Sequence, residues 1–242
     1  AGGVGSSPRE LDSSETGAEP AVEKTEPSAE VETEIEAADA LRKPTSGNYV
    51  ITAEDDLGMK GPKTSFRKNV EAIKTMKQIL AEGRLATPEE QKVLVQYVGW
   101  GGLKQVFDPV WNVPADWREE AKELRELLTP QEWQEAAGTV LNAHYTSKEV
   151  ISAMYDGLRH FGFKGGRVLE PAMGVGHFIG LMPLELLKAS QFTGVEIDTT
   201  TGNIGKLLYP KSDIRIMGFE NTKLADNMYD IAIGNVPFGN VS

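Results

Sequence analysis

The chain of 242 residues is 40% hydrophobic, so it is long enough to form one large or two small domains around a core. It contains no cysteine, which excludes disulfides and cysteine metal ligands and fits a cytoplasmic protein. No stretch of about 18 consecutive apolar residues occurs, so we expect no membrane-spanning helix. The histidines His144, His160 and His177 lack the spacing of a zinc site, and we predict no metal.

The negative charge of the chain is concentrated at its amino terminus. Residues 1–40 contain nine Glu and two Asp against one Arg and one Lys, a net −9 of the total −11, so the remainder carries −2. Residues 1–46 are rich in Glu, Ser, Ala and Pro and contain no aromatic residue. Such a segment cannot bury enough apolar surface to offset the entropy lost on ordering. We therefore expect residues 1–46 to form a disordered acidic tail.

Residues 47–140 are expected to form a helical N-terminal region. Apolar residues recur at helical spacing in residues 65–84, and further helices are expected over residues 86–102, 115–128 and 129–138. Two of these helices begin with Thr-Pro, which puts Thr at the cap and Pro at the first helical position. In the first of them Glu90 lies three residues after Thr87, which is the pattern of a capping box.

Two features of this helical region allow more than one interpretation. Its lysines between residues 60 and 77 form either a solvated helix face, the commoner case, or a local basic face. Trp100, between the glycines of GWGG, is either a buried anchor between helices or an exposed ring that stacks on a base.

Residues 141–242 have the pattern of an α/β sheet. A helix is expected over residues 143–163, capped by Thr146 with Glu149 as its partner. Short apolar strands then alternate with helical or loop segments, and they are expected at residues 167–171, 191–198, 214–219 and 229–235. This alternation predicts a parallel sheet, in which ligands bind beyond the carboxyl ends of the strands.

The first strand ends in EPAMGVGHF, where Gly174 and Gly176 allow a tight turn and a close approach to a ligand. The third glycine of a dinucleotide-binding pattern is absent, because Ile179 occupies its position. The carboxylate of Glu170 would repel a pyrophosphate and attract a cation. S-adenosylmethionine (SAM) carries an ammonium and a sulfonium, so this turn favours SAM over NAD; the alternative is a structural strand-to-helix turn.

The later strand ends supply further candidate contacts to an adenosine ligand. Glu196, with Asp198 nearby, lies 20 residues beyond Gly176 and is placed to accept hydrogen bonds from both ribose hydroxyls, as in NAD and SAM sites alike. A solvated acid in a turn is the alternative. Phe219 or Glu220, after the third strand, is expected near the adenine.

Two other stretches complete the candidate site. The helix N-terminus at HYTSKE, with the hydroxyl of Thr146, suits the methionine carboxylate of SAM. In IAIGNVPFGN, Asn235 and a neighbouring carbonyl can accept the two N–H bonds of an exocyclic amine that attacks a methyl group. Pro237 stiffens that turn, and Phe238 can stack on a base taken out of the duplex. A plain turn is the alternative for this stretch alone.

YTSKEV, VLEPAMGVGHF, GVEID and GNVPF resemble motifs of the SAM-dependent DNA methyltransferases that act on the N6 amine of adenine. GNVPF is similar to their N-P-P-F/Y motif, with Val236 in place of the first proline. The resemblance implies a Rossmann-like fold, SAM as cofactor and DNA as substrate, with Asn235, Pro237 and Phe238 as catalytic residues. The cofactor-binding residues that follow from the matched motifs and strand ends are Tyr145, Thr146, Glu170, Pro171, Ala172, Gly174, Gly176, Phe178, Glu196, Asp198, Phe219 and Glu220.

Three longer stretches are ATPEEQKVLVQYVGWGGLKQVFD, GFKGGRVLEPAMGVGHFIGLMP and AIGNVPFG. Together they resemble more narrowly the amino-terminal part of the large methylase–helicase proteins of phages and conjugative elements, from about residue 64 onward. On this basis residues 141–242 are the first half of a methyltransferase domain, an incomplete Rossmann-like sheet. We expect a longer chain to supply the remaining strands and the helicase region, and we expect this chain alone to be inactive. Two alternatives remain: a protein-glutamine or RNA methyltransferase, and a non-catalytic SAM- or DNA-binding module.

Overall fold

A computed structural model describes residues 2, 47–57, 61–140 and 146–236 of the chain. Except for Gly2, the predicted acidic tail lies outside these residues, so its disorder stays a prediction. The described residues from 47 onward belong to one unit, Asp39–Ser242. Within the described ranges, no helix is long and apolar enough to cross a membrane.

The helical region contains four α-helices, which are α2 (Pro62–Glu82), α3 (Pro88–Leu94), α4 (Arg118–Leu127) and α5 (Pro130–Thr139). Short 3₁₀ turns join them at Lys104–Val106, Val110–Asn112 and Ala115–Trp117, and another precedes α2 at Ala53–Asp55. The predicted capping box of α3 is present, and α5 has one as well: Thr87 and Thr129 each accept a bond from the glutamate amide three residues later. Helix α3 is shorter than predicted, because the chain turns away after Leu94 toward GWGG.

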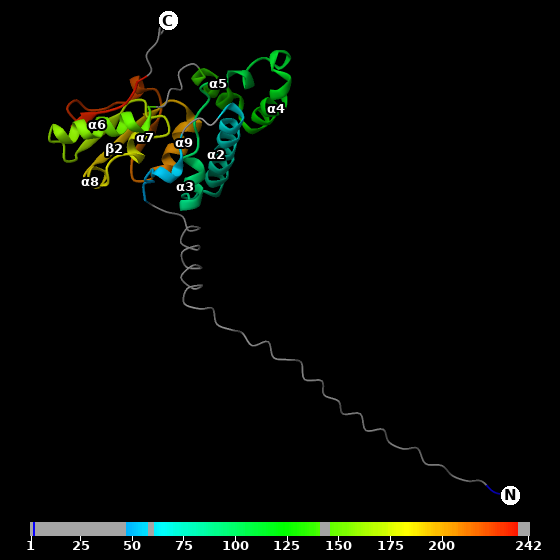
Figure 1. Cartoon of the computed structure of the whole chain (residues 1–242), viewed down its shortest axis with the longest axis horizontal. Coiled ribbons are helices and arrows are strands. Elements are labelled where there is room, and N and C mark those ends of the chain that lie inside the picture. The colour runs from blue at the N-terminus through cyan, green and yellow to red at the C-terminus, as the bar shows by residue number, and fades with distance from the viewer. Residues whose placement is uncertain (1, 3–46, 58–60, 141–145, 237–242) are drawn as a thin grey trace. The chain divides into compact units, whose positions relative to one another are not determined.

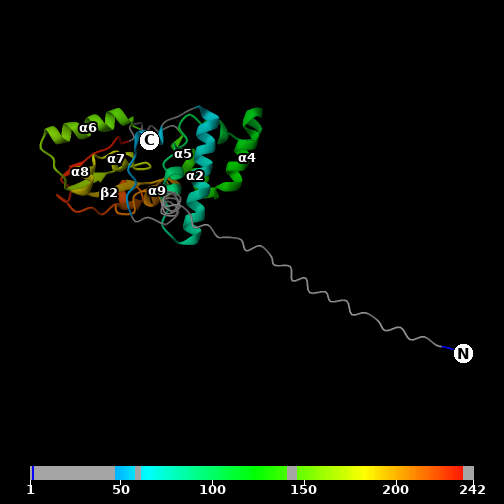
Figure 2. The ribbon, with the colours of Figure 1, turned by 60° about the horizontal axis from the view of Figure 1, so that its bottom comes forward.

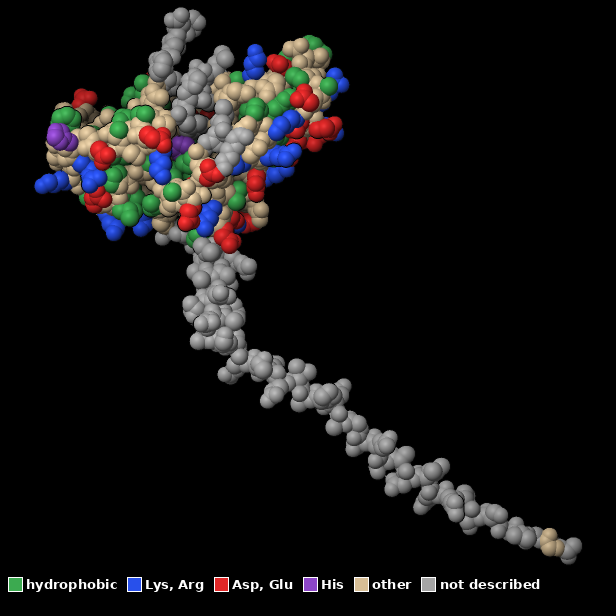
Figure 3. All heavy atoms as spheres, in the orientation of Figure 1, with side chains coloured by type: hydrophobic (Ala, Val, Ile, Leu, Met, Phe, Trp, Pro, Cys, Tyr) green, Lys and Arg blue, Asp and Glu red, His purple; other side chains and the backbone are tan. Residues whose placement is uncertain are grey.

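Three lysines of α2 form ion pairs with acids on the neighbouring helices, and Lys68 donates to the side chain of Gln96 at 2.5 Å. Lys63 lies 2.7 Å from Glu120, and Lys74 lies 2.6 Å from Glu123 on α4. Lys77 lies 2.6 Å from Glu132 on α5. Figure 3 shows charges of both signs interspersed over α2 and α4. The α2 lysines therefore serve helix packing more than they form a basic face.

Trp100 is a buried anchor of this region. Its side chain is 1% exposed and packs edge-on against Phe107, with ring centroids 5.3 Å apart. Phe66 of α2 and Tyr97 also pack against it. The base-stacking interpretation of Trp100 is thereby excluded in this fold, because no face of the ring is open to a ligand.

The helix before the first strand is α6 (Lys148–His160), and its cap differs from the prediction. Ser147, not Thr146, is the N-cap, and its hydroxyl accepts a bond from the amide of Val150 at 3.4 Å. Ser147 has the extended backbone that an N-cap requires and directly precedes the first helical residue. Thr146 is left half-buried at the wall of a cavity.

The four predicted strands are confirmed as β1 (Arg167–Glu170), β2 (Gln191–Glu196), β3 (Asp213–Ile216) and β4 (Ile231–Ala232). They form a parallel sheet in the order β3-β2-β1-β4. Helices α7 (His177–Gly180) and α8 (Leu184–Lys188) connect β1 to β2, and α9 (Thr199–Leu208) connects β2 to β3. The strand order reverses between β1 and β4, which is where open α/β sheets bind ligands.

The helical region packs against the sheet through α9. Helices α2, α3 and α5 all contact α9, which in turn contacts β2 and β3 (Figures 1 and 2). The buried side chain of Gln91 on α3 donates to the carbonyl of Leu207 at 3.0 Å. The segment before α2 also joins this packing, because the amide of Tyr49 donates to the carbonyl of Leu208 at 2.8 Å. These contacts place α5 beside the carboxyl end of β2.

Candidate functional site

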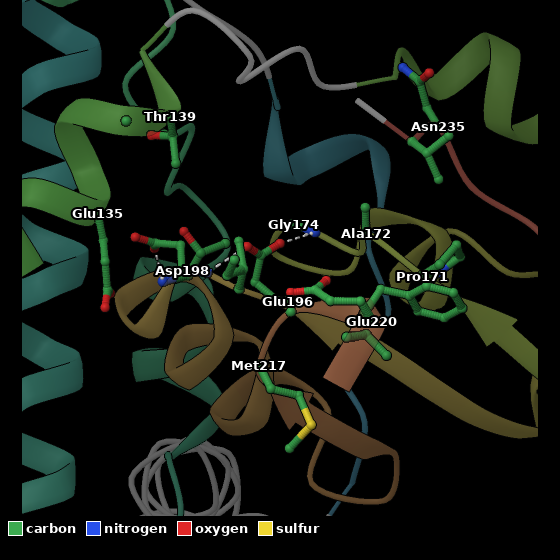
Figure 4. A pocket seen from close by; sticks show the side chains of 18 of the residues that line it. Glu135, Thr139, Pro171, Ala172, Gly174, Glu196, Asp198, Met217, Glu220 and Asn235 are labelled. Carbon is green, nitrogen blue, oxygen red and sulfur yellow. Dashed lines mark hydrogen bonds between the residues drawn. The ribbon is translucent and has the colours of Figure 1, made fainter. Parts of the chain in front are cut away.

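A cavity of about 650 Å³ opens at the carboxyl ends of the strands (Figure 4). Residues that follow each of the four strands line it, and so do residues of α5 and of the turn after α3. Figure 4 shows α5 at one end of the cavity and Asn235 at the other. The volume falls within the range of small-molecule and cofactor sites, about 300 to 1,000 Å³.

Glu170, at the end of β1, faces a second cavity of about 50 Å³ beside the first. Its side chain is only 2% exposed, and within the described residues its Oε2 atom has no hydrogen-bond partner. Burial, and then the charge of Glu196, hold the pKa of the Glu170 carboxyl well above its usual value. A buried carboxyl oxygen without a hydrogen-bond partner can accept hydrogen bonds from a cationic group.

Glu196, at the end of β2, is oriented toward the large cavity by backbone amides. Its Oε2 accepts from the amide of Gly174 at 2.8 Å, and its Oε1 accepts from the amide of Asp198 at 2.9 Å. The backbone of Ile197 also bonds to this carboxylate, which has about four acceptor positions, so a hydroxyl donor can still be accommodated. Burial raises the pKa of Glu196, while these amide bonds act in the opposite direction.

Two carboxylates accept hydrogen bonds from backbone amides at the N-terminus of α9. Asp198 is its N-cap and accepts from the amide of Thr201 at 2.7 Å. Glu135, from α5, accepts from the amide of Thr199 at 2.9 Å. Burial raises the pKa of Asp198. The free amides with which a helix N-terminus binds phosphate are therefore engaged at these two positions.

The glycine turn after β1 adopts the left-handed backbone that favours glycine, with φ of 56° at Gly174 and 84° at Gly176. Gly174 lines both cavities. Gly176 is buried instead, and a Cβ atom there would lie 2.5 Å from the ring of Tyr209. The second glycine therefore serves packing, while the first brings the backbone to the site.

The turn after β4 places Asn235 at the junction of the two cavities. This turn lies against the end of β1, because a Cβ atom on Gly234 would come within 3.2 Å of the Glu170 side chain. Asn235 itself is exposed, so its carboxamide is available to a substrate. Pro237 and Phe238 lie outside the described residues.

Most of the described residues predicted for the site come together around these cavities. The large cavity is lined by Pro171, Ala172, Gly174, Glu196, Asp198, Phe219, Glu220 and Asn235. The small cavity is lined by Thr146, Glu170, Ala172, Gly174, Phe178 and Asn235. Gly176 lies beneath the turn and lines neither, and Tyr145 is outside the described residues.

Sequence reasoning missed one whole wall of the large cavity. This wall comes from the helical region and consists of Tyr97, Gly99, Gln134, Glu135, Gly138 and Thr139. Helix α5 has only an ordinary capping pattern, and its place at the site depends on packing against α9. The apolar side chains of Ile197 and Met217 were also missed, although they flank predicted residues in the sequence.

The site is acidic. Four carboxylates, those of Glu135, Glu196, Asp198 and Glu220, line the large cavity, and none of its described lining residues is Lys, Arg or His. His177, at the small cavity, is neutral near pH 7 because burial lowers its pKa to about 4. Such a site attracts cations and ligands rich in hydrogen-bond donors, and it repels phosphate groups.

Comparisons with known proteins gave partial similarities. No protein-family model matches the chain. Over 119 residues, 48% of the chain, it is 29% identical to the "Defense against restriction protein B" of Escherichia phage P1, and it spans only 5% of that protein's length. A solved structure of a putative class I SAM-dependent methyltransferase from Listeria monocytogenes covers 73% of the chain at 13% identity, with a TM-score of 0.37; 60% of that structure is matched.

Proposed function

We propose that the chain is the SAM-binding portion of a methyltransferase and that its substrate is the N6 amine of adenine in DNA. The large cavity would hold the adenosine part of SAM, with Glu196 accepting from the ribose hydroxyls. The small cavity would hold the methionine part, with Glu170 facing its ammonium group. Phe219 and Glu220 would lie at the adenine, and Thr146 with the start of α6 would lie near the methionine carboxylate.

The observation that carries the choice of cofactor is the set of carboxylates at backbone amides. Glu196 engages the amide of Gly174 in the glycine turn, where a dinucleotide would place its pyrophosphate. Glu135 and Asp198 engage two amides at the start of α9. A phosphate in either position would face a carboxylate at hydrogen-bonding distance. SAM has no phosphate and carries two cationic groups, so it fits these same residues.

The position of Asn235 supports methyl transfer to a planar amine. SAM supplies an electrophilic methyl group when it is bound, and the junction of the two cavities is where its sulfonium would lie. The Asn235 carboxamide oxygen would accept one N–H of the amine, and a neighbouring main-chain carbonyl would accept the other. These acceptors stabilise the positive charge that develops on the nitrogen as it becomes tetrahedral. The methylated amine would release one proton to solvent at the exposed turn, and S-adenosylhomocysteine (SAH) would be left. Pro237 and Phe238 are proposed to stiffen the turn and to stack on the target base.

DNA is the proposed substrate because one similar protein is named for defence against restriction, and restriction acts on DNA. The resemblance of GNVPF to the adenine-N6 motif points the same way. A protein glutamine amide or an RNA base would meet the same two acceptors, so these substrates are alternative outcomes of the test.

Two measurements test the proposal. Calorimetric titration of the chain with SAM, SAH and NAD should show binding of the first two in preference to NAD, and tighter NAD binding would refute the cofactor assignment. In the whole protein, transfer of a labelled methyl group should occur to adenine-containing DNA and not to RNA or protein. Asn235→Ala should abolish that transfer while SAH affinity stays unchanged. Full activity in this variant would refute the role of the turn.

A further inference from the structure

Helix α5 brings side chains to the large cavity from outside the α/β sheet. Glu135, Gly138 and Thr139 line the cavity. Figure 4 shows Glu135 and Thr139 at the end of the cavity where Asp198 lies, away from Asn235. Glu135 is bound through Oε2 to the amide of Thr199 and through Oε1 to the side chain of Gln131. Each oxygen keeps one acceptor position, so Glu135 is fixed in orientation without being saturated.

Helix α5 is held rigidly in this position by the packing of the GWGG turn. Its Trp133 packs against Phe107, with ring centroids 4.9 Å apart, and Phe107 packs in turn against the buried Trp100. The turn is fixed by the buried side chain of Asn69, which accepts from the amide of Val98 at 2.9 Å and donates to the carbonyl of Gly99 at 2.5 Å. The turn thereby also places Gly99 in the cavity lining.

We propose that α5 is the outer wall of the nucleoside subsite and that Glu135 accepts a hydrogen bond from the adenosine part of the ligand. This inference rests on the proposed function and assigns the helical region to the cofactor site. A DNA-contacting role for this region has less support, since three lysines of α2 pair with Glu120, Glu123 and Glu132. Hydrogen-bond acceptors line the large cavity from α5, from the start of α9 and from the end of β3. The ligand that fits them is a nucleoside whose exposed edge donates hydrogen bonds.

A pair of glycines offers a matched steric test. A Cβ atom on Gly138 of α5 or on Gly157 of α6 would meet no other atom within 4 Å, so the fold has room for a side chain at both positions. Gly138 lines the large cavity, whereas Gly157 lines neither cavity. Gly138→Leu should therefore fill the nucleoside subsite, and Gly157→Leu should not. Neither change should lower the melting temperature, because leucine is a better helix former than glycine.

Glu135→Gln tests the acceptor role without breaking the contact between α5 and α9. The glutamine oxygen can still accept from the Thr199 amide, but its NH₂ group cannot accept from a ligand. Glu123→Gln is the control, since Glu123 lies on α4 and pairs with Lys74 outside the cavity. The affinity for SAH should fall about tenfold to a hundredfold in Glu135→Gln and stay unchanged in the control.

The experiment is calorimetric titration of SAH into the 242-residue chain and the four variants, with a thermal melt of each. We expect weaker binding in Gly138→Leu and Glu135→Gln only, at unchanged melting temperature. If the unaltered chain binds no SAH, the proposed function fails. If the unaltered chain binds SAH and both α5 variants bind it equally well, the proposed function stands and the α5 inference is overturned. Weakened DNA binding by the whole protein in Gly138→Leu, with SAH affinity unchanged, would also overturn it and assign α5 to DNA. Should Gly138→Leu melt early, Glu135→Gln decides.

Discussion

Glu170→Gln should stabilise the folded chain above about pH 4.5 and leave its stability unchanged below that pH. The Glu170 carboxyl is 2% exposed, and burial and the charge of Glu196 hold its pKa well above the usual value. In the unfolded chain this carboxyl ionises near pH 4.5, while in the folded chain it stays protonated up to its raised pKa. Between these two values the folded state binds more protons than the unfolded state. Glu170 alone therefore lowers the stability of the unaltered chain by about 1.4 kcal/mol per pH unit between these two values as the pH rises.

Urea unfolding at a series of pH values between about 4 and 8 measures this difference. Glu196 and Asp198 also have pKa values raised by burial, so both proteins should retain a decline with pH. The signature is the gap between the two curves, which should widen as the pH rises through the window and then level off. Parallel curves for Glu170→Gln and the unaltered chain would refute a buried, protonated Glu170.

Three further predictions concern the site and the packing around it. Glu196→Ala should weaken SAH binding about tenfold to a hundredfold by titration, because a hydrogen bond to a charged group contributes about 1.5 to 3 kcal/mol; unchanged affinity would make Glu196 a structural acid only. Ser147→Ala should lower the free energy of unfolding by about 1 kcal/mol through loss of the α6 cap, and Thr146→Ala should lower it less. Urea unfolding measures both changes, and the opposite ranking would show that Thr146 is the cap. Trp100→Ala should cost about 3 to 5 kcal/mol, and a loss within 1 kcal/mol would contradict its buried position.

Much of the α/β part could be predicted because its signals are local. The strands are short apolar runs, and their carboxyl ends carry the glycines and acids that line the cavities. The capping box of α3 and the Thr-Pro start of α5 could be predicted for the same reason, since each depends on residues close in sequence. The cap of α6 was misplaced by one residue because Thr146 and Ser147 offer the same hydroxyl chemistry, and only the backbone distinguishes them.

The contribution of the helical region could not be predicted, because it arises from contacts distant in sequence. Glu135 reaches the amide of Thr199 across 64 residues, and no local pattern in α5 distinguishes this glutamate from its solvated neighbours. The GWGG turn was ambiguous for the same reason. Whether Trp100 is buried depends on Phe66 and Phe107, which lie on either side of it in sequence and meet it only in the folded chain.

The carboxyl groups at the two cavities connect stability with the proposed function. Glu170, Glu196 and Asp198 all have pKa values raised chiefly by burial, so ionising them costs the folded chain free energy. A cation in the cavities would favour their ionised forms and reverse that cost. The same reasoning ranks ligands: a phosphate would add to the negative charge, a neutral nucleoside would leave it uncompensated, and a ligand with an ammonium and a sulfonium would offset it. Under the proposed function, we therefore expect the acidic cavity to bind SAM more strongly than SAH at neutral pH, because only SAM carries the sulfonium.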